Sequence, residues 1–372
     1  QEAAAAALLH WTEAGPPRSP AAWLLQAARR RGIDRIRRRG TADRHARELA
    51  RMALAQDDDR SAAKDEDIPD ERLRLIFTCC HPALDPKTRV ALTLRTLGGL
   101  TTAEIATAFL DKEPAMAQRL VRAKKKIATA GLPYAVPGPD AWPERLPHVL
   151  TVIYLIFNEG YGGAAGQMLR ADLCAEAIWL CRMLADLAPG EAEVEGLLAL
   201  LLLIDARRDA RRDTHGAFVP LDAQDRSLWD RAKIDRAVAI LEQALARRRP
   251  GAFQIKAAIQ GVHGVAEHPE NTDWDEVRAL YDVLLRFEDT PVVRLNRAVA
   301  VSFALGARAG ADALAPLRSA LQDYAPYFAA RADICRRLGD QKGARDAYDR
   351  ALLLVGEGDE KAFLARRRGE LG

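Results

Sequence analysis

The stretch from Thr101 to Ile127 constrains this chain most, because its apolar residues recur at helical spacing in two segments around a tight turn. In the first segment Ile105 and Phe109 fall at i and i+4, which predicts one apolar helix face. Glu113 and Pro114 open the second segment, since proline lacks an N–H that the first turn leaves unpaired and a carboxylate suits the positive end of the helix dipole. The apolar face of this second helix is made by Met116, Leu120, Ala123 and Ile127.

The remaining faces of the second helix are strongly basic. They carry Gln118, Arg119, Arg122, Lys124, Lys125 and Lys126. Two short helices with a basic second helix are the layout of a helix-turn-helix, in which the second helix lies in the DNA major groove. The alternative is an amphipathic helical hairpin whose basic face is simply solvated.

Composition favours an all-α protein. The chain has 372 residues, enough for two or three domains, and Ala, Leu and Arg dominate over β-branched and aromatic residues. Its longest apolar run, residues 196–204, is too short to span a bilayer. No basic-then-apolar leader precedes a cleavage site, so we expect a cytoplasmic protein that does not bind membranes.

The cysteines are odd in number and scattered, which favours free thiols in a reducing compartment. They are Cys79, Cys80, Cys174, Cys181 and Cys335. Although His81 follows the first pair, no second pair lies at the spacing of a zinc site, so we expect no metal. Cys174 and Cys181 lie two turns apart on a predicted helix and are expected to point inward.

Charge is unevenly distributed along the first third of the chain. Residues 29–39 carry seven arginines and one aspartate, a net charge of +6, whereas residues 57–71 carry eight acids against two bases, a net charge of −6. The basic helix-turn-helix segment follows. This order suggests two elements that face nucleic acid, joined by a solvated acidic linker.

A proline-rich segment divides the chain. Residues 133–147 hold five prolines, which stop helices and predict a domain boundary. Beyond it, helical segments continue to the C-terminus, and residues 328–351 place aromatic and small residues where a tetratricopeptide repeat has them. Residues 292–321 and 253–285 repeat the plan, so we expect a stacked helical array.

Five phrases, in order and spacing, resemble the extracytoplasmic-function group of the sigma-70 family of transcription initiation factors. The closer likeness is to the subgroup with a C-terminal tetratricopeptide-like extension. The phrases are WLLQAARRRGIDRIRRR (Trp23–Arg39), DERLRLIFTCCHPAL (Asp70–Leu84), RVALTLRTLGGLTTAEIATAFL (Arg89–Leu110), MAQRLVRAKKKI (Met116–Ile127) and FNEGYG (Phe157–Gly162).

The resemblance implies a domain plan and two DNA contacts. Its parts are residues 1–40, a partial region 2 truncated at its N-terminus; 41–68, an acidic linker; 69–132, region 4; 133–147, a proline-rich linker; and 148–372, the repeat-like extension. In such factors region 2 binds core RNA polymerase and melts the −10 element, which here assigns DNA contacts to Arg29, Arg30, Arg31 and Arg35.

By the same resemblance region 4 reads the −35 element. It assigns base-edge or phosphate contacts to Gln118, Arg119 and Arg122, and phosphate contacts to Lys124, Lys125 and Lys126. Arginine pairs bidentately with guanine and glutamine reads adenine, while lysine binds phosphate without reading sequence. The implied partners are promoter DNA, core polymerase and a regulatory protein on the C-terminal array.

Two features depart from the family pattern. The chain begins at Gln1 inside what looks like the middle of region 2, so much of the polymerase-binding surface is expected to be missing. Asp111 and Lys112 occupy the turn where the pattern has an apolar residue, which is expected to loosen the turn or alter its docking.

No segment predicts catalysis or a cofactor. Asn158, Glu159 and Tyr161 cluster beside glycines, but no nucleophile or phosphate-cradling loop accompanies them, which favours a helix end. Two other functions stay open: a helix-turn-helix regulator of another type whose repeats sense a ligand or protein, and a scaffold whose repeats bind a peptide. The first basic segment favours the initiation factor, since a simple regulator needs no second DNA element.

Overall fold

The computed structural model describes residues 71–109, 111–132, 137, 141–162, 171–214, 217–356 and 358–371. Within these ranges every regular element is a helix, and the one bridged pair of extended residues is Arg212 with Phe218. The predicted all-α class is therefore confirmed. The predictions for residues 1–40, including Arg29, Arg30, Arg31 and Arg35, and for residues 41–68 lie outside the described residues.

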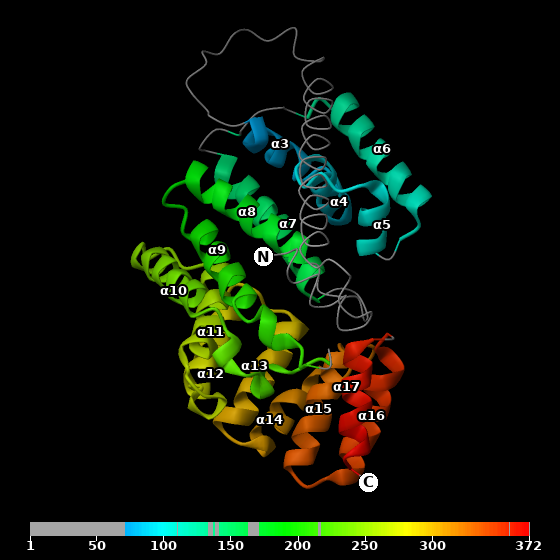
Figure 1. The fold of residues 1–372 in the computed structure, drawn as a ribbon, viewed down its shortest axis with the longest axis vertical. Helices are drawn as coiled ribbons and strands as arrows, with labels where there is room; N and C mark the ends of the chain where they lie inside the picture. Colours follow the sequence, from blue (N-terminus) through cyan, green and yellow to red (C-terminus); the bar gives the residue numbers. More distant parts are fainter. Residues whose placement is uncertain are drawn as a thin grey trace, which may run out of the picture. The chain divides into compact units, whose positions relative to one another are not determined.

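The chain divides into two compact units, Gln1–Val152 and Ile153–Gly372. In the described part of the first unit α4 packs against α3, α5 and α6 (Figure 1). The bounds are α3 Glu71–Cys79, α4 Pro86–Thr96, α5 Thr102–Ala108, α6 Glu113–Thr129 and α7 Trp142–Gly162.

Local sequence sets the ends of these helices. Asp85 caps α4, because its carboxylate accepts from the Thr88 N–H at 3.0 Å. Thr101 and Glu104 form a reciprocal capping box at the start of α5, with Glu104 Oε2 accepting from the Thr101 N–H at 2.7 Å and Thr101 Oγ1 accepting from the Glu104 N–H at 3.1 Å. Between the two helices Gly99 turns the chain with φ +66°. The entry to the helix-turn-helix is thereby fixed.

Helix α7 starts earlier than the proline-rich sequence predicts. It begins at Trp142, so residues 142–147 of the expected linker are helical. Pro143 lies in the first turn, where an N–H has no intrahelical partner to lose, and Pro147 removes a single bond one turn later. Arg145 compensates by donating to the Phe77 carbonyl at 2.9 Å, which anchors this turn of α7 on α3.

The second unit is a succession of helices in which neighbours along the chain pack together, as Figure 1 shows from α8 to α17. Their bounds are α8 Ala171–Leu187, α9 Ala192–Asp205, α10 Arg231–Ala246, α11 Ala252–Val265, α12 Trp274–Leu284, α13 Pro291–Ala304, α14 Ala307–Leu314, α15 Ala325–Arg337, α16 Gln341–Leu354 and α17 Asp359–Gly369. Short 3-10 turns lie at Arg208–Arg211, Leu221–Ala223, Arg226–Leu228, Pro269–Asn271 and Ala315–Leu317. The predicted C-terminal helical array is confirmed.

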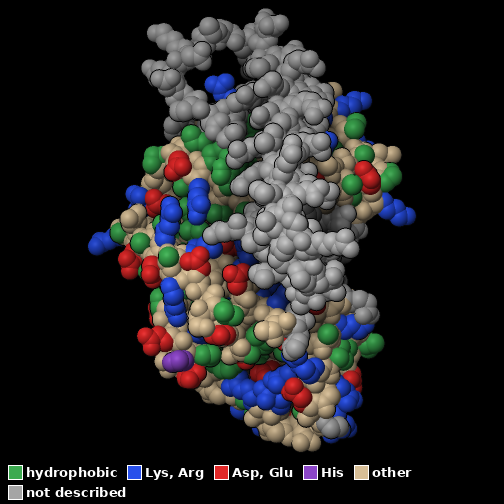
Figure 2. All heavy atoms as spheres, viewed as in Figure 1, with side chains coloured by type: hydrophobic (Ala, Val, Ile, Leu, Met, Phe, Trp, Pro, Cys, Tyr) green, Lys and Arg blue, Asp and Glu red, His purple; other side chains and the backbone are tan. Residues whose placement is uncertain are grey.

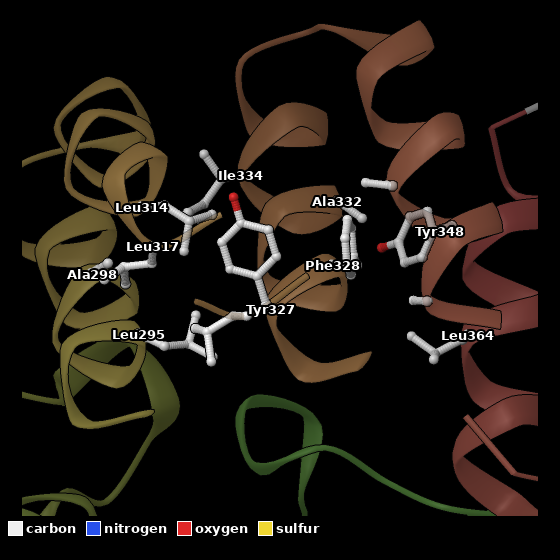
Figure 3. Close-up of a cluster of buried hydrophobic side chains, with 13 residues drawn as sticks. Leu295, Ala298, Leu314, Leu317, Tyr327, Phe328, Ala332, Ile334, Tyr348 and Leu364 are labelled. Atoms are coloured by element: carbon white, nitrogen blue, oxygen red, sulfur yellow. The ribbon is translucent and has the colours of Figure 1, made fainter. Parts of the chain in front are cut away.

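Buried apolar side chains hold the last helices of the array together. Tyr327 and Phe328 are neighbours on α15 that serve two interfaces: in Figure 3 Tyr327 lies on the side of Leu314 and Leu317, and Phe328 faces Tyr348 of α16. The two rings are 2% and 7% exposed and meet edge to face with centroids 5.1 Å apart. One helix thus joins the preceding and following pairs.

The three segments predicted as repeats are three consecutive helix pairs. Residues 253–285 contain α11 and α12, residues 292–321 contain α13 and α14, and residues 328–351 fall on α15 and α16. The turns inside the last two pairs both use a left-handed glycine, Gly306 with φ +94° and Gly339 with φ +77°. On the face drawn in Figure 2, Lys and Arg side chains gather over α14 and α15.

Candidate nucleic-acid interface

Helix α6 has one buried and one exposed face. Its buried residues are Met116, Leu120, Ala123 and Ile127, which confirms the predicted apolar stripe. Of the six predicted contact residues, Gln118, Arg122, Lys125 and Lys126 are exposed, whereas Arg119 and Lys124 are half-buried. The four exposed residues therefore form the open face of α6, and the two half-buried residues lie at its edges.

Val121 belongs to the exposed face of α6, although the sequence pattern did not predict it. Its side chain is 65% exposed, and around the helix it comes next to Lys125, with Gln118 and Arg122 beyond. A β-branched apolar residue outside the apolar stripe of α6 was the available signal. Such a side chain in a basic face can meet the methyl group of thymine.

Asp111 ties the turn of the helix-turn-helix to both neighbouring helices. Its Oδ2 lies 3.3 Å from Arg119 Nη2 of α6 and 3.4 Å from Lys87 Nζ of α4, and its Oδ1 accepts from the Lys112 N–H at 3.0 Å. Burial raises the pKa of Asp111, but the Lys112 N–H and the cations of Lys87 and Arg119 outweigh it and hold the pKa below the usual value. Of the two expected effects, loosening of the turn is contradicted, because the Asp111 carboxylate links the turn to α4 and α6.

A hollow of about 490 Å³ lies between the start of α4 and α6. Its polar lining comes from Asp85, Thr88, Gln118, Arg119, Arg122 and Lys126. Burial raises the pKa of Asp85, yet hydrogen bonds from Thr88 and the charge of Arg119 hold it below the usual value. Arg119 Nε is buried here without a hydrogen-bond partner, so this guanidinium has unused donor capacity.

The thiols near α3 are parts of the core of this unit, and the His81 imidazole beside them is half-buried. Cys79 and Cys80 are buried, and burial raises the pKa of Cys80 to about 12. Burial and the charges of Arg145 and Arg89 lower the pKa of His81 to about 4. Cys174 and Cys181 are buried, as predicted. Across the described ranges no three His, Cys, Asp or Glu side chains converge as a metal site would require.

Residues 74–127 match the family Sigma-70, region 4, and residues 145–245 match a family of unknown function, DUF6596. The chain is 44% identical over 373 residues to the uncharacterized protein R00370 of Rhizobium meliloti (strain 1021), an alignment that covers 98% of this chain and 87% of the relative. The chain belongs to the family of R00370. No solved structure matches it.

The match to region 4 covers the four helices α3 to α6, including the turn at Asp111 and the exposed face of α6. This family member therefore carries a sigma-70 region 4 domain, a non-catalytic DNA-binding domain, followed by a DUF6596 region. The domain indicates sigma-factor-like DNA binding in transcription. Among the described helices none is both long and apolar enough to cross a bilayer.

Proposed function

We propose that this protein is a sigma factor of the extracytoplasmic-function group, which directs bacterial RNA polymerase to promoters in the cytoplasm. The observation that carries the proposal is the exposed basic face of α6 within a region 4 domain. Its partners are promoter DNA and core RNA polymerase. In this proposal α6 enters the major groove of the −35 element.

Three side chains form the reading face, and Lys125, which we assign to a phosphate, shares their side of α6. Gln118, Val121, Arg122 and Lys125 follow one another at i, i+3, i+4 and i+7, so they share one side of α6. We assign Arg122 to a guanine edge, Gln118 to an adenine edge and Val121 to a thymine methyl. Lys124, Lys125 and Lys126 contact phosphates, which position the helix without reading sequence.

Arg119 has a different place in this proposal. Its guanidinium lies on the flank of α6 toward α4, paired with Asp111. From there it reaches the backbone or the base edge at the border of the site, with Asp111 setting its orientation. The basic residues Arg29, Arg30, Arg31 and Arg35 are proposed as the second contact, at the −10 element. They lie in a region 2 segment within residues 1–40, which a linker of residues 41–68 separates from region 4.

We further propose that the array beginning near residue 148 is tetratricopeptide-like and regulates the factor by contacting a protein. Consecutive helix pairs and the matching left-handed glycines Gly306 and Gly339 support this. The test is a chain that ends at Val152, where the division between the two units falls, compared with the intact chain in transcription. Equal activity at every concentration would contradict regulation, while loss or gain would show that the array activates or inhibits.

DNA reading is tested by selecting duplexes from a random pool with the intact protein. The proposal expects one enriched motif, and Arg122→Ala should relax its preference at one base while leaving the rest unchanged. Enrichment of no motif would contradict a reading role for α6. The main alternative is a helix-turn-helix regulator of another type with a sensing repeat domain; it predicts the same motif but no co-purification with core polymerase.

A further inference from the structure

Hydrogen-bond donors without partners concentrate in one place in the second unit. In the described part of the chain ten buried side-chain nitrogen or oxygen atoms lack a hydrogen-bond partner, and six of them lie between residues 207 and 229. Five of the six are nitrogen donors: Arg207 Nε and Nη1, Arg208 Nε, Arg226 Nε and Trp229 Nε1. Buried polar groups in folded proteins are nearly always paired, so a run of unmatched donors indicates a missing acceptor.

Arg207 is the centre of this cluster. It follows the end of α9, is 7% exposed, and makes one side-chain hydrogen bond, from Nη2 to Gln260 Oε1 at 2.5 Å. Its guanidinium also lies 5.7 Å from the centroid of the Trp229 ring. No carboxylate of the described residues forms an ion pair with it, which is unusual because a buried charge is costly unless it is paired.

The nearby carboxylate is already occupied. Asp205 forms an ion pair with Arg208 through one oxygen and with Lys233 through the other at 3.0 Å. Arg211 has no carboxylate either: it donates to the Tyr161 carbonyl and lies over the Tyr161 ring with 4.1 Å between its Cζ and the ring centroid. Arg207 and Arg211 therefore bring two positive charges that nothing in the described residues neutralises.

Arg226 shows what a structural arginine looks like in the same region. Its Nη1 donates to the carbonyls of His263 at 3.0 Å and Ala266 at 2.5 Å, at the C-terminal end of α11, and its Nη2 donates to Thr272 Oγ1 at 3.3 Å. The negative end of the helix dipole compensates its charge. Arg207 has no such arrangement. Burial lowers its pKa and the charges of Arg211 and Arg226 lower it further, although Tyr161 opposes them.

We propose that the second unit binds a compact oxyanion, a phosphate or carboxylate group, through Arg207 and Arg211. Guanidinium groups bind such oxyanions through paired N–H donors, which Arg207 has unused. The side chain of Arg208 is 27% exposed and Arg211 is half-buried, so the cluster reaches solvent on that side. This gives the DUF6596 region, which holds Tyr161, Arg207 and Arg211, a ligand of its own that is independent of DNA.

The test measures thermal unfolding of the intact chain against inorganic phosphate at constant ionic strength, with isothermal titration calorimetry for affinity. The same measurements with sulfate and with acetate show whether the site prefers a tetrahedral oxyanion or a carboxylate. We expect the unfolding temperature to rise saturably with at least one of these anions. Arg207→Gln should lower the affinity for that anion about tenfold or more, because charged hydrogen bonds are lost.

Two further variants keep the test decisive. Arg211→Gln, at a half-buried position, should also lower the affinity for the anion. It replaces Arg207→Gln in the test if that variant does not fold. Arg236→Gln, on the exposed face of α10, is the matched control and should bind as the wild type does. Absence of stabilisation by all three anions would overturn the proposal. Anion affinities of both the Arg207 and the Arg211 variant that equal the affinity of the wild type would also overturn it, because the anion would then bind elsewhere, for example on α6.

Discussion

The Asp111 carboxylate lies 3.3 Å from the Arg119 guanidinium. An acidic side chain in the turn therefore pairs with a basic side chain of α6, the helix that we propose enters the groove. The same oxygen contacts Lys87 at 3.4 Å. Two positive charges from two helices thus converge on one negative charge. DNA phosphate repels Asp111 and attracts the Lys87 and Arg119 side chains. We therefore expect Asp111 to lower the affinity for DNA of any sequence while it fixes the orientation of Arg119.

Asp111→Asn should separate those two effects. Removing the charge should tighten binding to every duplex by about two- to fivefold, the scale of a partly exposed charge pair, while discrimination against altered sites falls because Arg119 is no longer oriented. Fluorescence anisotropy with the selected site and a scrambled duplex measures both. Asp209→Asn, an exposed acid of the second unit, is the control. Unchanged discrimination in Asp111→Asn would mean that Arg119 does not contribute to reading.

Arg122 and Lys125 should behave differently although both are exposed on α6. Arg122→Ala should cost about 1–3 kcal/mol on the preferred duplex and relax one base position. Lys125→Ala should weaken all duplexes alike and reduce the slope of log affinity against log salt by about 0.9. Titrations at several salt concentrations measure both quantities. The assignment fails if the two variants lose affinity in the same sequence-independent way.

Val121 provides a test that needs no new charge. If it meets a thymine methyl, replacing one thymine of the site by deoxyuridine should weaken the wild type by about 1 kcal/mol and leave Val121→Ser unaffected. Each thymine is exchanged in turn, and a double-mutant cycle gives the coupling. Equal losses for both proteins at every thymine would show that the 65% exposed side chain does not read the groove.

Much of the fold followed from local patterns, while contacts between distant segments did not. The buried stripe of α6 was predicted, because it depends on residues within a few turns. The pairing of Asp111 with Lys87 was not, since it requires α4 to lie against the turn. Residues 142–147 of the segment predicted as a linker are helical instead, because prolines were interpreted as stops and the contact of Arg145 with the Phe77 carbonyl joins distant segments.

The stability of the helical array should depend strongly on its buried side chains. Phe328 is 7% exposed between α15 and α16, and Phe328→Ala should lower the free energy of unfolding by about 3–5 kcal/mol through lost burial and a cavity. Leu353, 78% exposed on α16, is the control, and Leu353→Ala should change it by less than about 0.5 kcal/mol. Urea unfolding followed by circular dichroism measures both. A small effect of Phe328→Ala would contradict the packing of this hairpin.

Stability of the second unit should fall with acid through His263. Burial, together with the charges of Arg207 and Arg226, lowers the pKa of His263 to about 4, whereas the unfolded side chain titrates near its ordinary value of 6.5. The neutral imidazole therefore contributes stability fully above about pH 6.5, and this is lost as the pH falls toward 4. Between pH 7 and pH 5 the wild type should lose about 2 kcal/mol more than His263→Gln. Parallel urea titrations measure this, and equal losses would contradict a depressed pKa.

Transcription tests the central claim most directly. Bacterial core RNA polymerase is combined with the intact chain on a template that carries the selected site upstream of a start point, and runoff transcripts are counted for the wild type and for Arg122→Ala. We expect a discrete transcript that requires the protein and falls about tenfold or more with Arg122→Ala, the cost of one lost bidentate base contact. A transcript level that is the same without the protein, or that Arg122→Ala leaves unchanged, would contradict promoter recognition by α6.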